Sequence, residues 1–131
     1  MNTKILMMAS SVFYGVIGFG LTFLPEEFFG YVSADINPFS IVTLQILGAA
    51  YLGFAMLNWI TRRNPIGGIY GKPLLIANLV SFLVSSLTLI KMIGNIENHF
   101  NIFLALTIIY SAFTLAFIWA FKTNPKLKPE N

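Results

Sequence analysis

The chain has 131 residues, of which 56% are hydrophobic and only 10% are charged, and its formal net charge is +3. This composition excludes an ordinary soluble domain, and the length leaves no room for a second folded unit beside a membrane domain. The chain contains no cysteine, which excludes disulfides, thiol redox chemistry and cysteine-bound metals.

Four apolar stretches without ionisable charge in their central parts make up most of the chain, roughly 5–24, 38–60, 73–93 and 100–121. Each has about the 20 apolar residues that a helix needs to cross a hydrocarbon core ~30 Å thick. We therefore predict an all-α fold, an integral membrane four-helix bundle that forms a single domain over residues 1–131. Residues 123–131 are predicted to be a polar C-terminal tail.

A short helix is predicted directly after the first span, over Pro25–Phe29. Proline suits the first position of a helix, and Glu26 and Glu27 would place negative charge in the first turn, where the helix dipole favours it. Gly30 is expected to end this helix at the outer membrane interface. The alternative is an irregular loop with anchoring aromatic side chains.

The second span is predicted to begin at Asn37-Pro38, with asparagine as the N-cap and proline at the first helical position. Residues 64–72 are expected to form a turn-rich loop because they contain a proline and three glycines. Pro73 then opens the third span. The loop before the fourth span is short and contains two asparagines as candidate caps. We therefore predict that the third and fourth spans are antiparallel neighbours.

Basic residues are sorted between the two ends of the predicted spans. One set of ends carries Lys4, Arg62, Arg63, Lys72, Lys122, Lys126 and Lys128, and the other carries Lys91 with Glu26, Glu27, Asp35 and Glu97. Excess lysine and arginine mark the cytoplasmic side, so we expect a multi-pass cell-membrane protein with both termini and the second loop in the cytoplasm. A basic patch for anionic lipid headgroups is an alternative use of these charges. Their scatter over separate segments gives nucleic-acid binding no support.

Small and polar residues recur three or four positions apart within each predicted span. The first two spans carry Ser11, Gly15, Gly18 and Thr22, and Gln45, Gly48, Ala49, Leu52 and Gly53; the last two carry Asn78, Ser81, Ser85 and Thr88, and Thr107, Tyr110, Ser111 and Thr114. Small-residue stripes let membrane helices approach closely, and a glycine-lined ligand groove is the alternative. The hydroxyls and amides are expected to point inward, because lipid offers no hydrogen-bond partner.

Three tyrosines, Tyr14, Tyr51 and Tyr110, fall near the bilayer midplane when each helical residue rises ~1.5 Å. A tyrosine hydroxyl at this depth needs a partner, and the expected partners are Ser10, Ser85, Ser86 and Ser111. Two interpretations are open: interhelical hydrogen bonds, or a polar-ended cavity for an amphipathic, lipid-like molecule. The candidate ligand-binding residues of that cavity are Tyr14, Gln45, Tyr51, Asn78, Ser85, Tyr110 and Ser111.

The predicted spans contain no acidic residue and no histidine. We therefore expect no catalytic residue, no metal ligand and no cofactor, and no proton relay within the membrane. No nucleophile–base pair is visible either, so we do not expect an enzyme. His99 follows Glu97 in the third loop, where ordinary solvated loop residues are favoured over a surface metal site.

Two short segments stand out: Leu24-Pro25-Glu26-Glu27-Phe28-Phe29 after the first span, and Leu47-Gly48-Ala49-Ala50-Tyr51-Leu52-Gly53 in the second. They resemble the DoxX-like group of small four-helix bacterial membrane proteins and neighbouring uncharacterised families, and the similarity in layout covers nearly the whole chain. The resemblance implies a bacterial inner-membrane protein. Some members resemble accessory subunits of membrane redox assemblies, which here implies a partner and not the electron carrier.

Together these features favour a non-catalytic integral membrane protein, either an accessory subunit or a binder of a lipid-like, amphipathic ligand. The alternative is a facilitated carrier of a small neutral or amphipathic solute. The expected partners are the lipid bilayer, a membrane protein or a second copy of the chain, and a lipid-like ligand. No nucleic-acid partner is expected.

Overall fold

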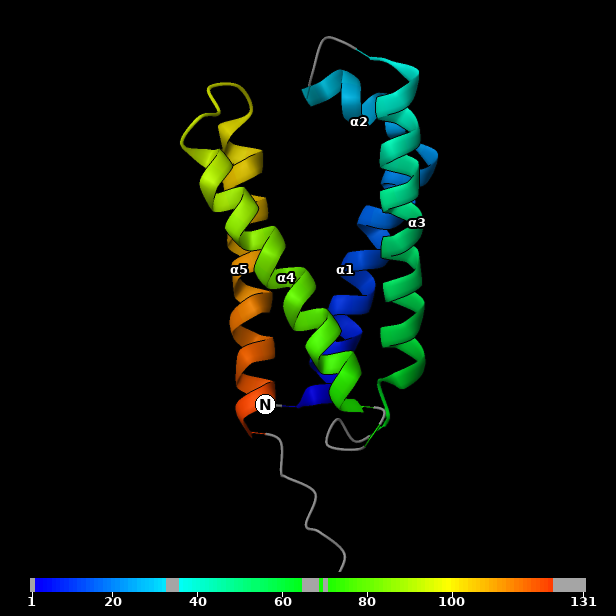
Figure 1. The fold of residues 1–131 in the computed structure, drawn as a ribbon, viewed down its shortest axis with the longest axis vertical. Coiled ribbons are helices and arrows are strands. Elements are labelled where there is room, and N and C mark those ends of the chain that lie inside the picture. The colour runs from blue at the N-terminus through cyan, green and yellow to red at the C-terminus, as the bar shows by residue number, and fades with distance from the viewer. Residues whose placement is uncertain (1, 33–35, 65–68, 70, 124–131) are drawn as a thin grey trace, which may run out of the picture. The chain divides into compact units, whose positions relative to one another are not determined.

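The computed structural model describes residues 2–32, 36–64, 69 and 71–123. Within these residues the chain forms five helices and no strand: α1 (Thr3–Phe23), α2 (Pro25–Val32), α3 (Pro38–Thr61), α4 (Gly71–Ile93) and α5 (Phe100–Thr123) (Figure 1). By length and composition, α1, α3, α4 and α5 are able to cross a membrane. The predicted all-α class is confirmed, and the four predicted spans coincide with these helices. Asp35, the turn residues 65–68 and the tail from residue 124 lie outside the described residues.

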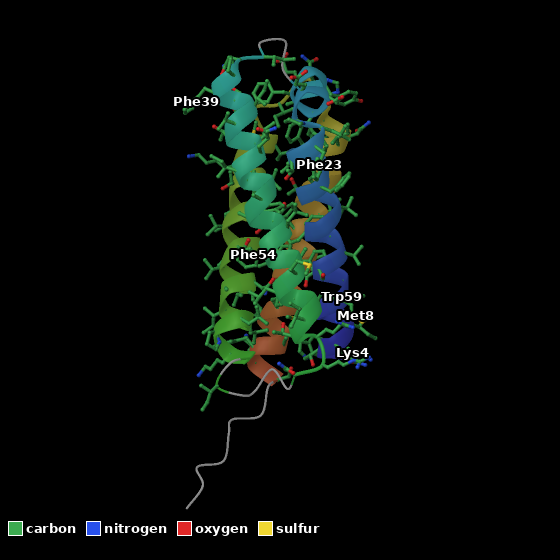
Figure 2. All side chains as sticks on the ribbon, turned by 90° about the vertical axis from the view of Figure 1, so that its right-hand side faces the viewer. Lys4, Met8, Phe23, Phe39, Phe54 and Trp59 are labelled. Atoms are coloured by element: carbon green, nitrogen blue, oxygen red, sulfur yellow. The ribbon has the colours of Figure 1, made fainter. Side chains whose placement is uncertain are left out.

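Contacts divide the chain into two compact units. The first unit, Met7–Arg62, contains α1 from Met7 onward together with α2 and α3, and it is called the α1–α3 unit below. α4 and α5 belong to the other unit, the α4–α5 unit. In the α1–α3 unit, α1 and α3 run antiparallel, with Phe23 and Phe39 near one end and Met8 and Trp59 near the other (Figure 2). In the α4–α5 unit, the two helices lie side by side and antiparallel, as their short connection predicts (Figure 1).

The short helix after the first span is present, so the alternative of an irregular loop is wrong. α2 begins at Pro25 and carries Glu26 and Glu27 in its first turn. A proline has no N–H to continue the hydrogen bonds of α1, so the helix breaks there and a new one starts. The predicted end at Gly30 is also wrong, because α2 continues to Val32.

Phe28 fixes the position of α2 on α1. A Cβ atom added to Gly20 would lie 2.9 Å from Cε2 of the Phe28 ring, so this ring covers the glycine. The backbone N–H of Phe28 also donates at 3.2 Å to the carbonyl of Leu24, the residue between the two helices. α2 contacts α3 as well. The acidic first turn of α2 is therefore held at the end of α1 and not left as a loose loop.

The start of α3 follows the prediction. Asn37 has an extended backbone and its Oδ1 accepts a hydrogen bond from the Ser40 backbone N–H at 2.8 Å, with Pro38 at the first helical position. The start of α5 differs. The residue before Phe100 is His99, with φ 58°, and not one of the two asparagines predicted as caps. A positive φ is uncommon for a residue other than glycine, although histidine adopts it more often than most.

Candidate functional site

α1 and α3 approach each other at two glycines of the predicted small-residue stripes. A Cβ atom added to Gly18 would lie 2.9 Å from the Gly48 carbonyl oxygen and 2.9 Å from the Leu52 backbone nitrogen. A Cβ atom added to Gly48 would lie 2.8 Å from the Thr22 backbone nitrogen and 2.9 Å from the Gly18 carbonyl oxygen. Close helix packing is therefore confirmed here, because backbone atoms fill the space that a side chain would need.

Gly53 does not take part in this approach. A Cβ atom added there meets no atom of the described residues within 4 Å. Gly15 is intermediate, since its added Cβ would make an ordinary contact of 3.7 Å with Ala55 Cβ. Within each stripe, the glycines are thus not equivalent, and only Gly18 and Gly48 are required by the packing.

A buried polar cluster joins the first half of α1 to the last turns of α3. The Asn58 side-chain amide donates to Ser10 Oγ at 3.0 Å, and Ser10 Oγ donates to the Met7 carbonyl at 3.0 Å. Ser11 Oγ donates to the Ala55 carbonyl at 2.6 Å. Asn58 and Ser10 are both 0% exposed. This cluster supplies interhelical hydrogen bonds between neutral groups.

Sequence reasoning missed Asn58, because an amide beside Trp59 at the end of a span is typical of the membrane interface. The available signal was depth. Ser10 lies about two turns inside α1 from its first residue, and Asn58 lies about one turn inside α3 from its last residue. Antiparallel packing therefore brings the two to nearby levels.

The structure brings together two of the predicted tyrosines. The Tyr14 ring meets the Tyr51 ring edge-on, with centroids 5.2 Å apart and an interplanar angle of 72°. Phe54 contributes a third ring at 5.3 Å from Tyr14. Tyr14 is 0% exposed and Tyr51 is partly exposed. Edge-on and tilted ring pairs of this kind contribute about 0.5–1.5 kcal/mol beyond their burial.

Gln45 is not part of that ring contact. Its side chain is exposed, and its Nε2 donates to the Thr22 carbonyl oxygen over a distance of 3.5 Å. This distance is at the outer limit of a hydrogen bond. Gln45 therefore presents an exposed polar amide on α3, beside the Thr22 carbonyl of α1.

In the α4–α5 unit, Tyr110 packs against an aromatic cluster. The Phe82 ring lies 5.8 Å from Tyr110 and stacks on Phe113 at 4.7 Å and Phe117 at 5.5 Å. Phe82 and Phe117 are 0% exposed, and Tyr110 is 5% exposed. The centre of this unit is therefore mainly a packed stack of rings contributed by both helices.

Hydroxyls and an amide surround the stack. Ser86 Oγ donates to the Leu83 carbonyl at 2.9 Å, Thr114 Oγ1 donates to the Tyr110 carbonyl at 2.8 Å, and the two hydroxyl oxygens lie 3.4 Å apart. The amide of Asn78, which is 0% exposed, donates to the Leu74 carbonyl at 3.0 Å. Most of these donors serve their own helix, as serine and threonine do in membrane spans.

The candidate residues thus fall into both units. Tyr14, Gln45 and Tyr51 belong to the α1–α3 unit, and Asn78, Ser85, Tyr110 and Ser111 to the α4–α5 unit. Tyr14, Asn78 and Tyr110 are buried, Tyr51, Ser85 and Ser111 are partly exposed, and Gln45 is exposed. Among the candidates, Tyr14 and Tyr51 contact each other through their rings.

The buried polar residues of the described part of the chain are all neutral: Ser10, Ser11, Asn58, Asn78, Ser86 and Thr114. Each buried polar side-chain atom in the described ranges has a hydrogen-bond partner. In the part of the chain that the structure describes, no three histidine, aspartate or glutamate side chains are grouped so that they could hold a metal ion. Such neutral groups orient and bind by hydrogen bonding and packing.

Comparison with protein-family models, curated proteins and solved structures finds no match to this chain. The chemistry open to the chain is therefore inferred from its own side chains. Aromatic rings, hydroxyls and amides lie inside, and lysine, arginine and tryptophan lie at the helix ends. Such a set suits recognition of an amphipathic molecule or of another membrane helix.

Proposed function

We propose that the chain is a non-catalytic integral membrane protein that acts by binding, either as an accessory subunit or as a binder of a lipid-like, amphipathic ligand. The observation that carries this proposal is the neutrality of the buried polar side chains, each hydrogen-bonded, in the described residues. Neutral hydrogen-bonding groups stabilise helix pairs and recognise neutral polar groups of a ligand, whereas proton transfer requires groups that titrate.

The ligand-binding form of the proposal is supported by the aromatic residues near the middle of the helices. Tyr51 and Phe54, which are both partly exposed and pack against the buried Tyr14 ring, offer ring surface for an apolar body, and the Tyr51 ring carries a hydroxyl for a polar end. In the other unit, Tyr110 lies beside Phe82 and is followed by Ser111, whose side chain is partly exposed. Apolar surface with a few polar groups is the usual composition of a small-molecule site.

The accessory-subunit form is supported by the surface and by the resemblance to the DoxX-like group. Large apolar side chains such as Phe39, Ile46 and Leu115 are 83%, 66% and 67% exposed. Lipid or a neighbouring membrane helix covers such surface. On this proposal the chain sits in the bacterial inner membrane, with a membrane protein or a second copy as partner. Both termini would then lie in the cytoplasm, because basic residues at the helix ends favour that side.

Gentle extraction from the native membrane, affinity purification and native mass spectrometry test the proposal. We expect the chain to carry a membrane-protein partner, a second copy or a retained lipid-like molecule. Recovery of the chain with neither a partner nor a ligand, under conditions that preserve its helicity, would count against both forms of the proposal.

The alternative, a facilitated carrier of a small neutral or amphipathic solute, is favoured by one observation. The Gln45 side chain is exposed, and its amide makes a 3.5 Å contact with the Thr22 carbonyl of α1. A solute-binding amide would be placed in this way. Uptake into proteoliposomes that is slowed by Gln45→Leu, with helicity unchanged, would favour the carrier over the binding protein.

A further inference from the structure

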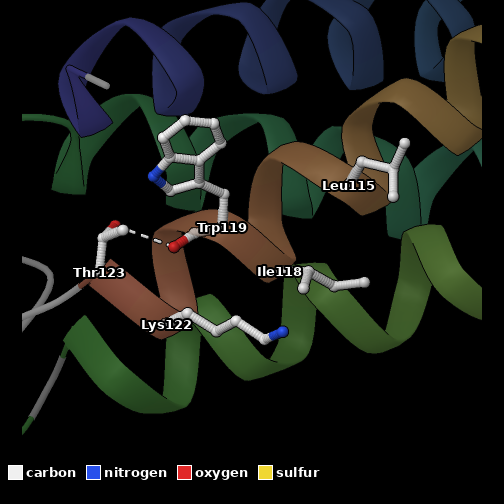
Figure 3. A pocket seen from close by; sticks show the side chains of 5 residues that line it. All are labelled: Leu115, Ile118, Trp119, Lys122 and Thr123. Carbon is white, nitrogen blue, oxygen red and sulfur yellow. Dashed lines mark hydrogen bonds between the residues drawn. The ribbon is translucent and has the colours of Figure 1, made fainter.

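A shallow apolar depression lies on the last turns of α5 (Figure 3). Its lining is Leu115, Ile118, Trp119, Lys122 and Thr123. These positions are three or four residues apart, so they share one face of the helix. Leu115 and Trp119 are 67% and 58% exposed, which leaves the depression open to the surroundings of the chain. None of the candidate ligand-binding residues lines it.

The depression combines an apolar floor with one positive charge. Lys122 lies in the last turn of α5, and its side chain runs back along the helix toward Ile118 (Figure 3). The ammonium group therefore lies beside the apolar lining and not beyond the end of the helix, as expected for helical side chains, which tilt toward the N-terminus. α4 and α5 contain no acidic residue, so neither helix of this unit neutralises the charge.

Two further groups define what can bind here. The Thr123 hydroxyl donates to the Trp119 carbonyl at 2.8 Å (Figure 3), so its proton is already used. The Trp119 indole is largely exposed and flanks the depression with its N–H directed toward the helix end. Tryptophan and lysine at the end of a span stand at the level of lipid headgroups.

We propose that this depression binds one phospholipid with an anionic headgroup. Its acyl chain lies on Leu115 and Ile118, its phosphate pairs with the Lys122 ammonium, and the Trp119 indole packs beside the glycerol region. A zwitterionic headgroup fits less well, because its own cation would find no carboxylate on α4 or α5. The inference stands whether the chain acts as an accessory subunit, a ligand binder or a carrier.

Trp119 itself reports on the lipid beside it. The chain has two tryptophans, so Trp59→Phe leaves Trp119 as the only one. We would reconstitute this protein in phosphatidylcholine vesicles and compare quenching by brominated phosphatidylglycerol with quenching by brominated phosphatidylcholine. A single lysine near a headgroup should favour the anionic lipid about five-fold in relative association constant. Lys122→Gln should bring the ratio to about one, and Lys122→Arg should keep it.

Lys72→Gln is the matched control. It removes the same charge from the first turn of α4, which lies at the same end of this antiparallel unit as the last turn of α5, but outside the depression. We expect it to retain more than half of the selectivity. Equal quenching by both lipids before any lysine is changed, or an equal loss for Lys72→Gln and Lys122→Gln, would overturn the proposal. Loss of selectivity on adding soluble glycerol phosphate would also overturn it, because the site would then bind a free anion.

Discussion

Asn58 of α3 donates its side-chain amide to the hydroxyl of Ser10 on α1 at 3.0 Å, and neither residue is exposed. Ser10 in turn donates to the Met7 carbonyl, so two hydrogen bonds in sequence connect the end of one helix to the beginning of another. No charge takes part in this connection. A buried pair of this kind stabilises the contact without the desolvation cost that an ion pair carries.

Asn58→Leu removes the donor of this pair while keeping a similar side-chain volume. Interhelical hydrogen bonds in membranes contribute about 0.6 kcal/mol on average and up to about 1.7 kcal/mol, so we expect a loss of about 1 kcal/mol in the free energy of unfolding. Equilibrium unfolding in mixed micelles measures it. Thr88→Val is the control, because the exposed Thr88 hydroxyl donates only to the Val84 carbonyl of its own helix. An Asn58→Leu protein as stable as the Thr88→Val protein would contradict the role of the pair.

Gly48→Ala and Gly53→Ala should differ strongly although both glycines lie on α3. An alanine Cβ at position 48 would lie 2.8 Å from the Thr22 backbone nitrogen, whereas at position 53 it meets nothing within 4 Å of the described residues. Overpacking costs about 1–3 kcal/mol, so we expect that loss for Gly48→Ala and a change within about 0.5 kcal/mol for Gly53→Ala. The same unfolding titration applies, and equal stabilities of the two variants would refute the close approach of α1 and α3.

Phe82→Ala should be among the most destabilising substitutions in the α4–α5 unit. The Phe82 ring is 0% exposed and contacts Tyr110, Phe113 and Phe117. Removing a buried phenylalanine side chain costs about 3–5 kcal/mol, in part through the cavity left behind. Thermal loss of helical circular dichroism in detergent compares this variant with Phe121→Ala, whose ring is 43% exposed. Similar midpoints for the two variants would show that the ring stack does not hold α4 to α5.

The proposed orientation can be tested because the chain has no cysteine. Single cysteines at Asn64 and Asn95, both exposed, report on the connections after α3 and after α4. We expect a membrane-impermeant maleimide to label Asn95→Cys in intact cells and Asn64→Cys only after permeabilisation, since arginine and lysine flank the second connection. The reverse pattern would place the termini outside.

Much of the fold could be predicted because membrane spans depend on local composition. A helix must satisfy its own backbone in lipid, so the apolar lengths alone predicted α1, α3, α4 and α5. Asn37 and Pro38 predicted the start of α3 through the chemistry of a helix cap. The end of α2 was missed because Gly30 has no positive φ and simply continues the helix.

The contacts of individual side chains were harder to predict, since they depend on how each helix is rotated about its axis. At ~1.5 Å per residue, Tyr14 lies about 16 Å from the start of α1 and Tyr51 about 15 Å from the end of α3. These two helix ends lie side by side in the antiparallel pair, so the equal depths predict that the two rings are at the same level. Depth does not say which face Gln45 occupies, and in the structure its side chain is exposed beside the Thr22 carbonyl of α1. The buried position of Asn58 could be predicted only together with its partner Ser10 on the neighbouring helix α1.

The central claim is that this protein acts by binding, and native mass spectrometry of the chain released from its own membrane tests it most directly. The chain alone has a mass of 14.6 kDa. We predict species above this mass that correspond to a protein partner, a second copy or a lipid-like ligand, and weaker retention of a ligand in Tyr51→Phe than in the unchanged protein. A spectrum that contains only the bare chain would contradict the claim.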